Sequence, residues 1–320
     1  MMKTLMVCSA GTGGGYATMM AARRHWSEKE IDLIATDTNP PNLCIASVFA
    51  DEYYQVPEAV DTHYNRFIGE IIERIKPDGI VAAVDRELIQ LDRVLDELRI
   101  REKTRLSVPK CWNFAKVFKD KLSVYRYLKQ KGFPVPTTRL ASEADDGEYI
   151  FKPMTGFGSR GVFVGRAQEL SFKNDLSRWI AQDLCQCPEI TVDVISDKSV
   201  TYTMCRERVE VKNGVSVKAR LFHDDELSRL AEKLARTLDF PYGFCFQVML
   251  GPNKEWLVTD LNPRLGAGSA MSYMVGSDFF GANVSRLLDP EASIGGFFRE
   301  FTGQAYVVRQ YSEFVTEILK

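Results

Sequence analysis

Three oxygen-bearing side chains in the C-terminal third of the chain could together bind a metal ion. Gln247 lies in the apolar segment FCFQVML, and Asp260 and Asn262 lie two residues apart in the segment EWLVTDLN. One carboxylate and two amide oxygens suit Mg²⁺, which takes few protein oxygens and completes its octahedron with water and phosphate oxygens. Arg264 follows closely and could neutralise charge on a phosphoryl group in transfer. The residue types therefore indicate chemistry on a metal-bound phosphate.

The two segments predict a hairpin that brings these side chains together. With the turn GPNK closing it, Gln247 is expected to face Val258, and Asp260 to be its diagonal neighbour on the same face. Period-two alternation keeps Asn262 and Arg264 on that face as well. The competing interpretation is a polar strand end followed by a turn at the proline after Asn262.

A glycine-rich loop in the middle of the chain could cover phosphates. The segment FKPMTGFGSRGVFVG places Lys152 at the end of one apolar strand and Gly156, Gly158 and Gly161 in the loop before the next. A Walker loop would run into a helix and carry Gly-Lys-Ser/Thr, and this segment does neither. A glycine loop between two strands can instead fold its backbone N–H groups over phosphates, with Lys152 adding positive charge beside them. The alternative is an ordinary flexible hairpin.

An earlier glycine cluster, AGTGGG, resembles the start of a dinucleotide-binding turn. Asp37 stands about twenty residues further on, where a ribose-binding acid would be expected. The fingerprint G-x-G-x-x-G nevertheless fails, because Tyr16 occupies the position of the third glycine. We therefore interpret the cluster as a tight strand-to-helix turn in preference to a bound NAD.

Further polar residues are candidates for substrate contacts. Asp85, Arg86 and Glu87 follow the apolar segment DGIVAAV, at the carboxyl-end crevice where open α/β sheets bind ligands. A basic run is expected on strands that face the site, although such runs are usually solvated, so that only one or two members would bind a carboxylate or acyl phosphate. The run comprises Arg206, Arg208, Lys212, Lys218 and Arg220.

The elements that must position these residues follow from the hydrophobic pattern. Strand and helix patterns alternate over the first hundred residues, which predicts a parallel, doubly wound sheet. From about Val108 a helix-rich stretch follows, and then strand patterns interrupted by helices near SFKNDLSRWI and DELSRLAEKLARTL. The dipeptide Asn213–Gly214 is a hairpin signal. The chain is thus predicted to be an α/β lobe followed by two α+β lobes.

Composition limits the class of protein. A length of 320 residues suits two or three lobes, and a formal charge of −2, from 41 basic and 43 acidic residues, argues against nucleic-acid binding. No apolar run is long enough to cross a bilayer, and the start MMKTLMVCSAGTGGG is interpreted as a strand and turn. Seven scattered cysteines are typical of reduced thiols, so we expect a cytoplasmic protein.

The motifs taken together resemble the ATP-grasp superfamily. FKPMTGFGSRGV, AQDL, PEITVDV, Gln247 and DLNPR carry the resemblance, which is closest to a single ATP-grasp module of the carbamoyl-phosphate synthetase large subunit. It covers nearly the whole chain and implies an N-terminal Rossmann-like pre-ATP-grasp lobe followed by an ATP-grasp fold of two α+β lobes. The implied divisions are residues 1–107, then 108–183 with the lid and glycine-rich flap, and then 184–320 with the metal site.

The resemblance assigns nucleotide-binding roles to matching positions. Lys121 and Lys152 are similar to the basic residues that reach the nucleotide phosphates, and Glu189 to the acid that holds the ribose hydroxyls. Gly156, Gly158 and Gly161 match the flap. The hinge whose backbone reads the adenine edge matches Gln182, Asp183 and Leu184.

The resemblance also implies the metal and catalytic residues. Gln247, Asp260 and Asn262 match the ligands of Mg²⁺ (or Mn²⁺), and Arg264 matches the arginine of the Asn-Pro-Arg motif. Lys152 and Arg264 are then the expected catalytic residues. The usual residue at position 260 is Glu, so Asp260, shorter by one methylene, leaves open whether one metal ion or two are bound.

The implied activity is that of an ATP- and Mg²⁺-dependent ligase. A carboxylate would attack the γ-phosphate of ATP to give an acyl phosphate, which an amine or ammonia then traps. The chain holds one module and no glutaminase, so a phosphorylating synthetase subunit that needs a partner chain is an alternative, and a homodimer is possible. Further alternatives are a non-catalytic ATP-binding regulatory module and, least favoured, an NAD-dependent oxidoreductase.

Overall fold

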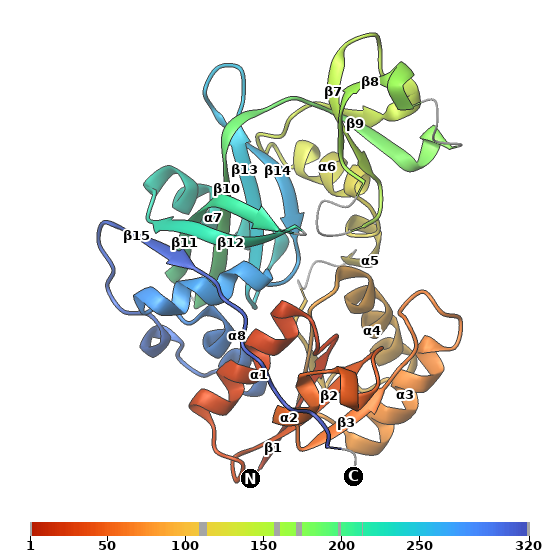
Figure 1. The fold of residues 1–320 in the computed structure, drawn as a ribbon, viewed down its shortest axis with the longest axis vertical. Coiled ribbons are helices and arrows are strands. Elements are labelled where there is room, and N and C mark those ends of the chain that lie inside the picture. Colours follow the sequence, from red (N-terminus) through yellow and green to blue (C-terminus); the bar gives the residue numbers. More distant parts are fainter. Residues whose placement is uncertain are drawn as a thin grey trace.

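Three β-sheets make up the computed structural model, which describes residues 2–108, 114–156, 161–170, 175–197, 200–212 and 214–318 (Figure 1). The first sheet is parallel, with the strand order β3-β2-β1-β4-β5. Its strands are β1 (Lys3–Cys8), β2 (Ile31–Asp37), β3 (Glu52–Gln55), β4 (Gly79–Ala82) and β5 (Arg105–Leu106). The helices of this lobe are α1 (Gly13–His25), α2 (Ala46–Phe49), α3 (Tyr64–Ile75) and α4 (Asp85–Glu97).

Strand β1 shows how the parallel sheet is covered on both faces. Leu5 and Val7 belong to the apolar cluster that includes α1, whereas Met6 and Cys8 belong to the cluster that includes α3 and α4. Successive side chains of a strand point to opposite faces, so both faces of this central strand are buried. The predicted doubly wound α/β lobe is confirmed.

The second sheet is antiparallel and has the strand order β6-β9-β7-β8. Two helices precede it, α5 (Phe114–Val117) and α6 (Lys121–Gln130), and Asp120 caps α6 by accepting a hydrogen bond from the backbone N–H of Ser123 at 2.7 Å. The strands are β6 (Thr138–Leu140), β7 (Glu148–Pro153), β8 (Phe163–Arg166) and β9 (Trp179–Asp183). In Figure 1 this sheet lies at the opposite end of the molecule from the N-terminal lobe.

The helix expected near SFKNDLSRWI is wrong for the part that the structure describes. Residues 171–174 lie outside the described residues, Leu176–Arg178 form one 3₁₀ turn, and the chain then continues as β9. Strand β9 is hydrogen-bonded on both sides, to β6 and to β7. Pairing on two sides outweighs the weak local helical pattern, as tertiary context often does.

The third sheet has six antiparallel strands in the order β14-β13-β10-β11-β12-β15. Helix α7 (Asp225–Leu238) packs on it through Leu227, Leu234 and Leu238, as its 3.6-residue pattern predicts. Of the predicted hairpin, Gly214 has φ +78°, while Asn213 lies outside the described residues. The strands are β10 (Gln186–Asp197), β11 (Val200–Lys212), β12 (Val215–Phe222), β13 (Phe244–Leu250), β14 (Trp256–Asn262) and β15 (Gln304–Val308).

The register of the β13–β14 hairpin differs from the prediction at the turn, where Leu250 pairs with Trp256, and again at a β-bulge. Val248, not Gln247, pairs with Val258, and an irregularity at Thr259 then places Asp260 directly opposite Gln247. In a regular strand Asp260 would share the buried face of Val258, because side chains alternate strictly. The extra residue at Thr259 turns Asp260 to the other face instead.

Helix α8 (Phe279–Leu288) fastens the third sheet to the N-terminal lobe. It lies beside α1 in Figure 1. A Cβ at Gly281 would come within 2.9 Å of the His25 ring, so a glycine is required for this approach. Val284, Leu287 and Leu288 are buried in the same apolar cluster as β1. The predicted divisions at 107/108 and 183/184 remain predictions.

Short 3₁₀ turns join several of these elements. They are Pro41–Leu43, Ala141–Glu143, Ala167–Leu170, Ala267–Val275 and Gly295–Phe297. No helix among the described residues is both long and apolar enough to cross a membrane.

A buried ion pair fixes the segment that follows Arg264. Asp193 is fully buried on β10 and accepts a hydrogen bond from Nη2 of Arg206 on β11 at 3.1 Å. Ser269, in the 3₁₀ turn Ala267–Val275, donates its hydroxyl to the same carboxylate at 2.6 Å. The charge of Asp193 is thus compensated by a cation and by a hydroxyl from the adjoining segment.

Replacing Asp193 with Ala is predicted to lower the free energy of unfolding by about 3–5 kcal/mol, because the Arg206 guanidinium would stay buried without its counter-charge. Urea unfolding measures this. The matched control is Glu210→Ala, which removes the partner of the exposed Lys212 and Lys218 in the same sheet and is expected to cost less than about 1 kcal/mol. Equal losses in the two variants would contradict the assignment.

Candidate active site

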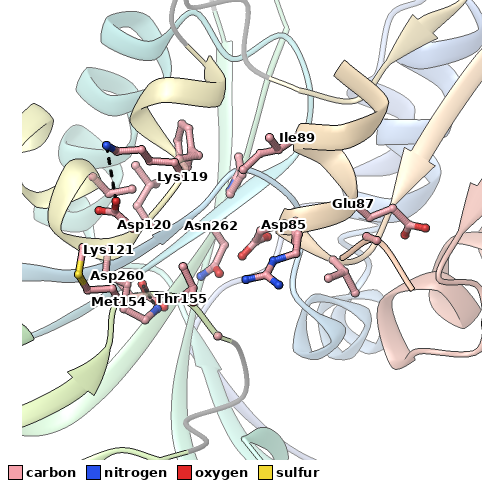
Figure 2. A pocket seen from close by; sticks show the side chains of 18 of the residues that line it. Asp85, Glu87, Ile89, Lys119, Asp120, Lys121, Met154, Thr155, Asp260 and Asn262 are labelled. Atoms are coloured by element: carbon pink, nitrogen blue, oxygen red, sulfur yellow. Dashed lines mark hydrogen bonds and ion pairs between the residues drawn. The ribbon is translucent and has the colours of Figure 1, made fainter. Parts of the chain in front are cut away.

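A cavity of about 620 Å³ lies where the three sheets meet. Its walls come from the carboxyl ends of β1, β2 and β4, from α6, from the strand ends of the second sheet and from β14. Figure 2 shows Lys121 and Asp260 together on one side of this space, Asp85 and Asn262 near its centre, and Glu87 on the other side. Six of the residues predicted to bind the nucleotide or the metal line it: Lys121, Lys152, Gly156, Gln182, Asp260 and Asn262. The predicted substrate candidates Asp85, Arg86 and Glu87 line it as well, whereas Gln247 and Arg264 do not.

Lys121 and Asp260 form an ion pair within the cavity. Lys121 is the first residue of α6, and its backbone N–H donates to the carbonyl of Met154 at 2.9 Å, which fixes the start of the helix to the end of β7. Its Nζ lies 3.4 Å from Oδ1 of Asp260. Asp260 raises the pKa of Lys121. Burial alone would raise the pKa of Asp260, but the ammonium groups of Lys121 and Lys152 hold it below its usual value.

Lys152 has a different set of partners. Its Nζ donates to Oε1 of Gln182 at 2.7 Å and to the carbonyl oxygen of Thr259, the bulge residue, at 3.4 Å. Burial lowers the pKa of Lys152. Both hydrogen-bond acceptors are neutral, and within the described part of the chain no carboxylate forms an ion pair with this lysine.

Of the predicted metal ligands, Asp260 and Asn262 line the cavity and Gln247 does not, so the ligand set stays a prediction. Gln247 and Asp260 are opposite each other in the register, and Asn262 pairs with Cys245 one step along the same face. Across the described residues, no cluster of three or more His, Cys, Asp or Glu side chains is arranged to hold a metal ion. One carboxylate with two amide oxygens is instead a hard donor set, which fits Mg²⁺ if phosphate oxygens complete the coordination.

The glycine-rich loop is described in part. Gly156 lines the cavity and has φ +140°, and Gly161 has φ +77° beside Pro153 and Trp179. Positive φ of this size favours glycine strongly, which explains both residues. Gly158 lies outside the described residues.

The predicted hinge residues lie at the end of β9, in the second sheet, and the predicted ribose residue Glu189 lies on β10, in the third. The backbone N–H of Asp183 donates to the carbonyl of Thr137 at 2.9 Å, and Leu184 is 39% exposed. Glu189 is paired with Arg208 through Oε1 at 2.6 Å. Asp183, Leu184 and Glu189 do not line the cavity in this conformation, and their contacts with a nucleotide stay predictions.

Arg264 is connected to the cavity by an ion pair with a carboxylate of the N-terminal lobe. Its Nε lies 2.7 Å from Oδ1 of Asp85, a cavity-lining residue in the first turn of α4. Burial opposes the charge, but Asp85 raises the pKa of Arg264. Arg264 therefore stays charged, and the ion pair connects the end of β14 to the first lobe.

Sequence reasoning missed a buried network at the far end of the cavity. Glu87 is 4% exposed and accepts hydrogen bonds from the hydroxyls of Ser9, at 2.5 Å, and Tyr64, at 2.8 Å. Burial raises the pKa of Glu87 to about 7. Ser9 follows β1 directly, and that position at the carboxyl edge of a parallel sheet was the available signal. No sequence motif indicates Tyr64.

The first glycine cluster has a structural role. Asp37 accepts hydrogen bonds from the backbone N–H of Gly11 at 2.8 Å and from the backbone N–H of Asn39 at 3.0 Å. A Cβ at Gly15 would come within 2.5 Å of the carbonyl oxygen of Ser9. These contacts support the interpretation as a tight turn and engage the acid that an NAD site would need.

The predicted basic run is taken up in ion pairs. Arg206 and Arg208 bind Asp193 and Glu189 as described above, and Arg220 pairs with Glu207 at 2.6 Å. Lys212 and Lys218 both pair with Glu210. The run is therefore paired within the third sheet, and none of its members lines the cavity.

Comparison with known families agrees with this site. The ATP-grasp domain family matches residues 118–268, a span that contains every predicted site residue from Lys121 to Arg264, and the PylC-like N-terminal domain family matches residues 5–103. Residues 118–268 therefore form an ATP-grasp domain. The ATP-grasp domain that the sequence predicted is thereby confirmed. No curated protein sequence matches the chain.

Solved structures share the ATP-grasp fold with this chain. N5-carboxyaminoimidazole synthetase from Staphylococcus aureus, complexed with ADP, is 16% identical, with a TM-score of 0.69 over 89% of this chain and 77% of that one. Biotin carboxylase from Campylobacter jejuni is 16% identical (TM-score 0.69, 96% and 75%), and L-amino acid ligase from Bacillus licheniformis is 14% identical (TM-score 0.68, 90% and 74%). At these identities the likeness concerns the fold.

Glu87 is predicted to make stability depend on pH. In the folded protein the carboxyl group of Glu87 has a pKa of about 7, whereas an ordinary glutamate has a pKa near 4.5. The folded state therefore binds more protons between these values, and the free energy of unfolding falls as pH rises through this window, by on the order of 3 kcal/mol.

Glu87→Gln is expected to flatten this part of the pH profile, measured by urea unfolding between pH 5 and pH 8. The matched control is Glu97→Gln at the exposed end of the same helix, which should keep the wild-type slope. A slope unchanged in Glu87→Gln would show that Glu87 is not the titrating group.

Proposed function

We propose that this ATP-grasp protein is an ATP- and Mg²⁺-dependent ligase that joins a carboxylate to an amine, or to ammonia, through an acyl phosphate. One observation supports this most directly. A single cavity is lined by Lys121, Lys152, Asp260 and Asn262 and is bounded by the Asp85–Arg264 ion pair. Cations for phosphates and hard oxygen donors for a metal ion are what phosphoryl transfer requires.

The nucleotide phosphates would lie against Lys121 and Lys152, under the loop that begins at Gly156. Asp260 and Asn262, with Gln247 opposite, would hold Mg²⁺, which when bound neutralises charge on the phosphates. Arg264, held by Asp85, would stabilise negative charge on the transferred phosphoryl group. Catalysis would then be mainly positioning and charge stabilisation, with the flap excluding water.

The acceptor end of the cavity is formed by the N-terminal lobe. Ser9, Asp85 and Glu87 line it, at the edge where open α/β sheets bind ligands. We assign the carboxylate substrate to this end, so that its carboxylate meets the γ-phosphate near Arg264. Relatives of the fold are a carboxyaminoimidazole synthetase, a biotin carboxylase and an amino acid ligase, which supports a small-molecule substrate. The resemblance of the sequence to a carbamoyl-phosphate synthetase module is a further part of this proposal.

The test is ADP release from ATP and Mg²⁺ across a panel of carboxylates, each with and without ammonia and amino acids. Substrate-dependent ADP release is expected for the wild type. Asp260→Asn and Lys152→Ala are expected to reduce it about 100-fold, because each removes charge that acts on the phosphates. Lys29→Ala, an exposed change in the first lobe, serves as the control and should be fully active.

Other outcomes separate the alternatives. Tight ATP binding without turnover for any pair would favour a regulatory module or a subunit that needs a partner chain, and size-exclusion chromatography with light scattering would report a homodimer. Absence of ATP binding would refute the proposal.

A further inference from the structure

Gln182 occupies a central position in the second sheet. It lies on β9, where it pairs with Thr138 of β6 on one side and with Ile150 of β7 on the other. Its side chain is 5% exposed and lines the cavity. A side-chain amide buried between two strands needs defined partners for its donors and its acceptor.

A directed chain of hydrogen bonds supplies those partners. The hydroxyl of Thr138 donates its single proton to the carbonyl oxygen of Pro136 at 3.0 Å. The oxygen of Thr138 can then only accept, and it accepts from Nε2 of Gln182 at 3.0 Å. Oε1 of Gln182 in turn accepts from Nζ of Lys152 at 2.7 Å.

This series of hydrogen bonds determines which way the side-chain amide of Gln182 points. A flipped amide would direct its NH₂ group at the Lys152 ammonium and its oxygen at a hydroxyl whose proton is already donated, so both contacts would be donor against donor or acceptor against acceptor. Thr138 is itself 5% exposed, so water cannot easily replace it. The carbonyl of Gln182 is therefore held facing Lys152.

These hydrogen bonds also leave the charge of Lys152 free to interact with a phosphate. Lys121 and Arg264 each have a carboxylate within 3.4 Å, in Asp260 and Asp85, whereas the partners of Lys152 are the neutral oxygens of Gln182 and Thr259. A lysine side chain loses considerable rotamer entropy when it is fixed. Because its acceptors are neutral, Lys152 is already ordered before a nucleotide binds, and its positive charge is not cancelled by a carboxylate.

We propose that Gln182 is a positioning residue for Lys152, with Thr138 as its anchor. The inference rests on the proposed nucleotide site, in which the backbone at Gln182 belongs to the adenine hinge. Gln182 then couples the two ends of the nucleotide, because its backbone is at the base and its side chain orders the lysine that meets the phosphates. Loss of the side chain weakens phosphate binding through Lys152 alone.

The experiment measures the Kd of the non-hydrolysable analogue AMP-PNP, with Mg²⁺, by calorimetry. Gln182→Met keeps the size of the side chain but removes the acceptor, and it is expected to raise Kd about tenfold, as loss of a hydrogen bond to a charged group does. Thr138→Val removes the anchor and is expected to raise Kd about threefold, while Thr138→Ser, which keeps the hydroxyl, should bind within about twofold of the wild type.

A double-mutant cycle separates positioning from general damage. If Gln182 acts through Lys152, then Gln182→Met adds no more than about twofold in a Lys152→Met background. Multiplied effects in the double variant, or wild-type affinity in Gln182→Met, would overturn the inference. Thermal unfolding checks that each variant is folded, and if Gln182→Met is not, the Thr138→Val and Thr138→Ser pair decides. Failure of the wild type to bind AMP-PNP would instead refute the proposed function.

Discussion

The β-bulge at Thr259 is the constraint on which the site depends. Two core residues of β14, Val258 and Leu261, are buried although they are three positions apart, which a regular strand does not allow. The extra residue satisfies both and leaves Asp260 facing the cavity opposite Gln247. The carbonyl oxygen of Thr259 also accepts from Lys152. One irregularity thus completes the core, directs the acid and helps to hold a lysine, which agrees with the frequency of bulges beside active sites.

The cations around the cavity differ in how their charge is balanced. Lys121 and Arg264 are each paired with a carboxylate, Asp260 and Asp85, so a phosphate that approaches them competes with a protein anion. Lys152 has neutral partners and presents its charge more directly. Such a division allows strong attraction for a polyphosphate while the empty site avoids three uncompensated positive charges in a space of low dielectric.

The sequence predicted the fold class and several of the charged and polar residues that line the cavity, because both depend on local patterns. Alternating strand and helix patterns and the order of motifs sufficed for the lobes, and Lys121, Lys152, Gln182, Asp260 and Asn262 do line one cavity. The register of β14 could not be read, since a bulge depends on which side chains the core accepts. The partners of Arg264 and Glu87 could not be predicted either. Asp85 is distant from Arg264 in sequence, and Tyr64, which donates to Glu87, belongs to no recognisable motif.

The packing of α8 limits how this chain can be divided and recombined. Leu287 and Leu288 complete the apolar cluster of the first sheet although they are distant from it in sequence, and their backbone carbonyls accept hydrogen bonds from Arg105. A fragment that ended after the first lobe would expose that cluster to water. A chimaera that takes its N-terminal lobe from a relative must therefore take the matching α8 as well. The exchanged part then consists of two separate segments of the sequence. The second sheet, which the chain enters after α6 and leaves before β10, is the segment that can be exchanged as a single insert.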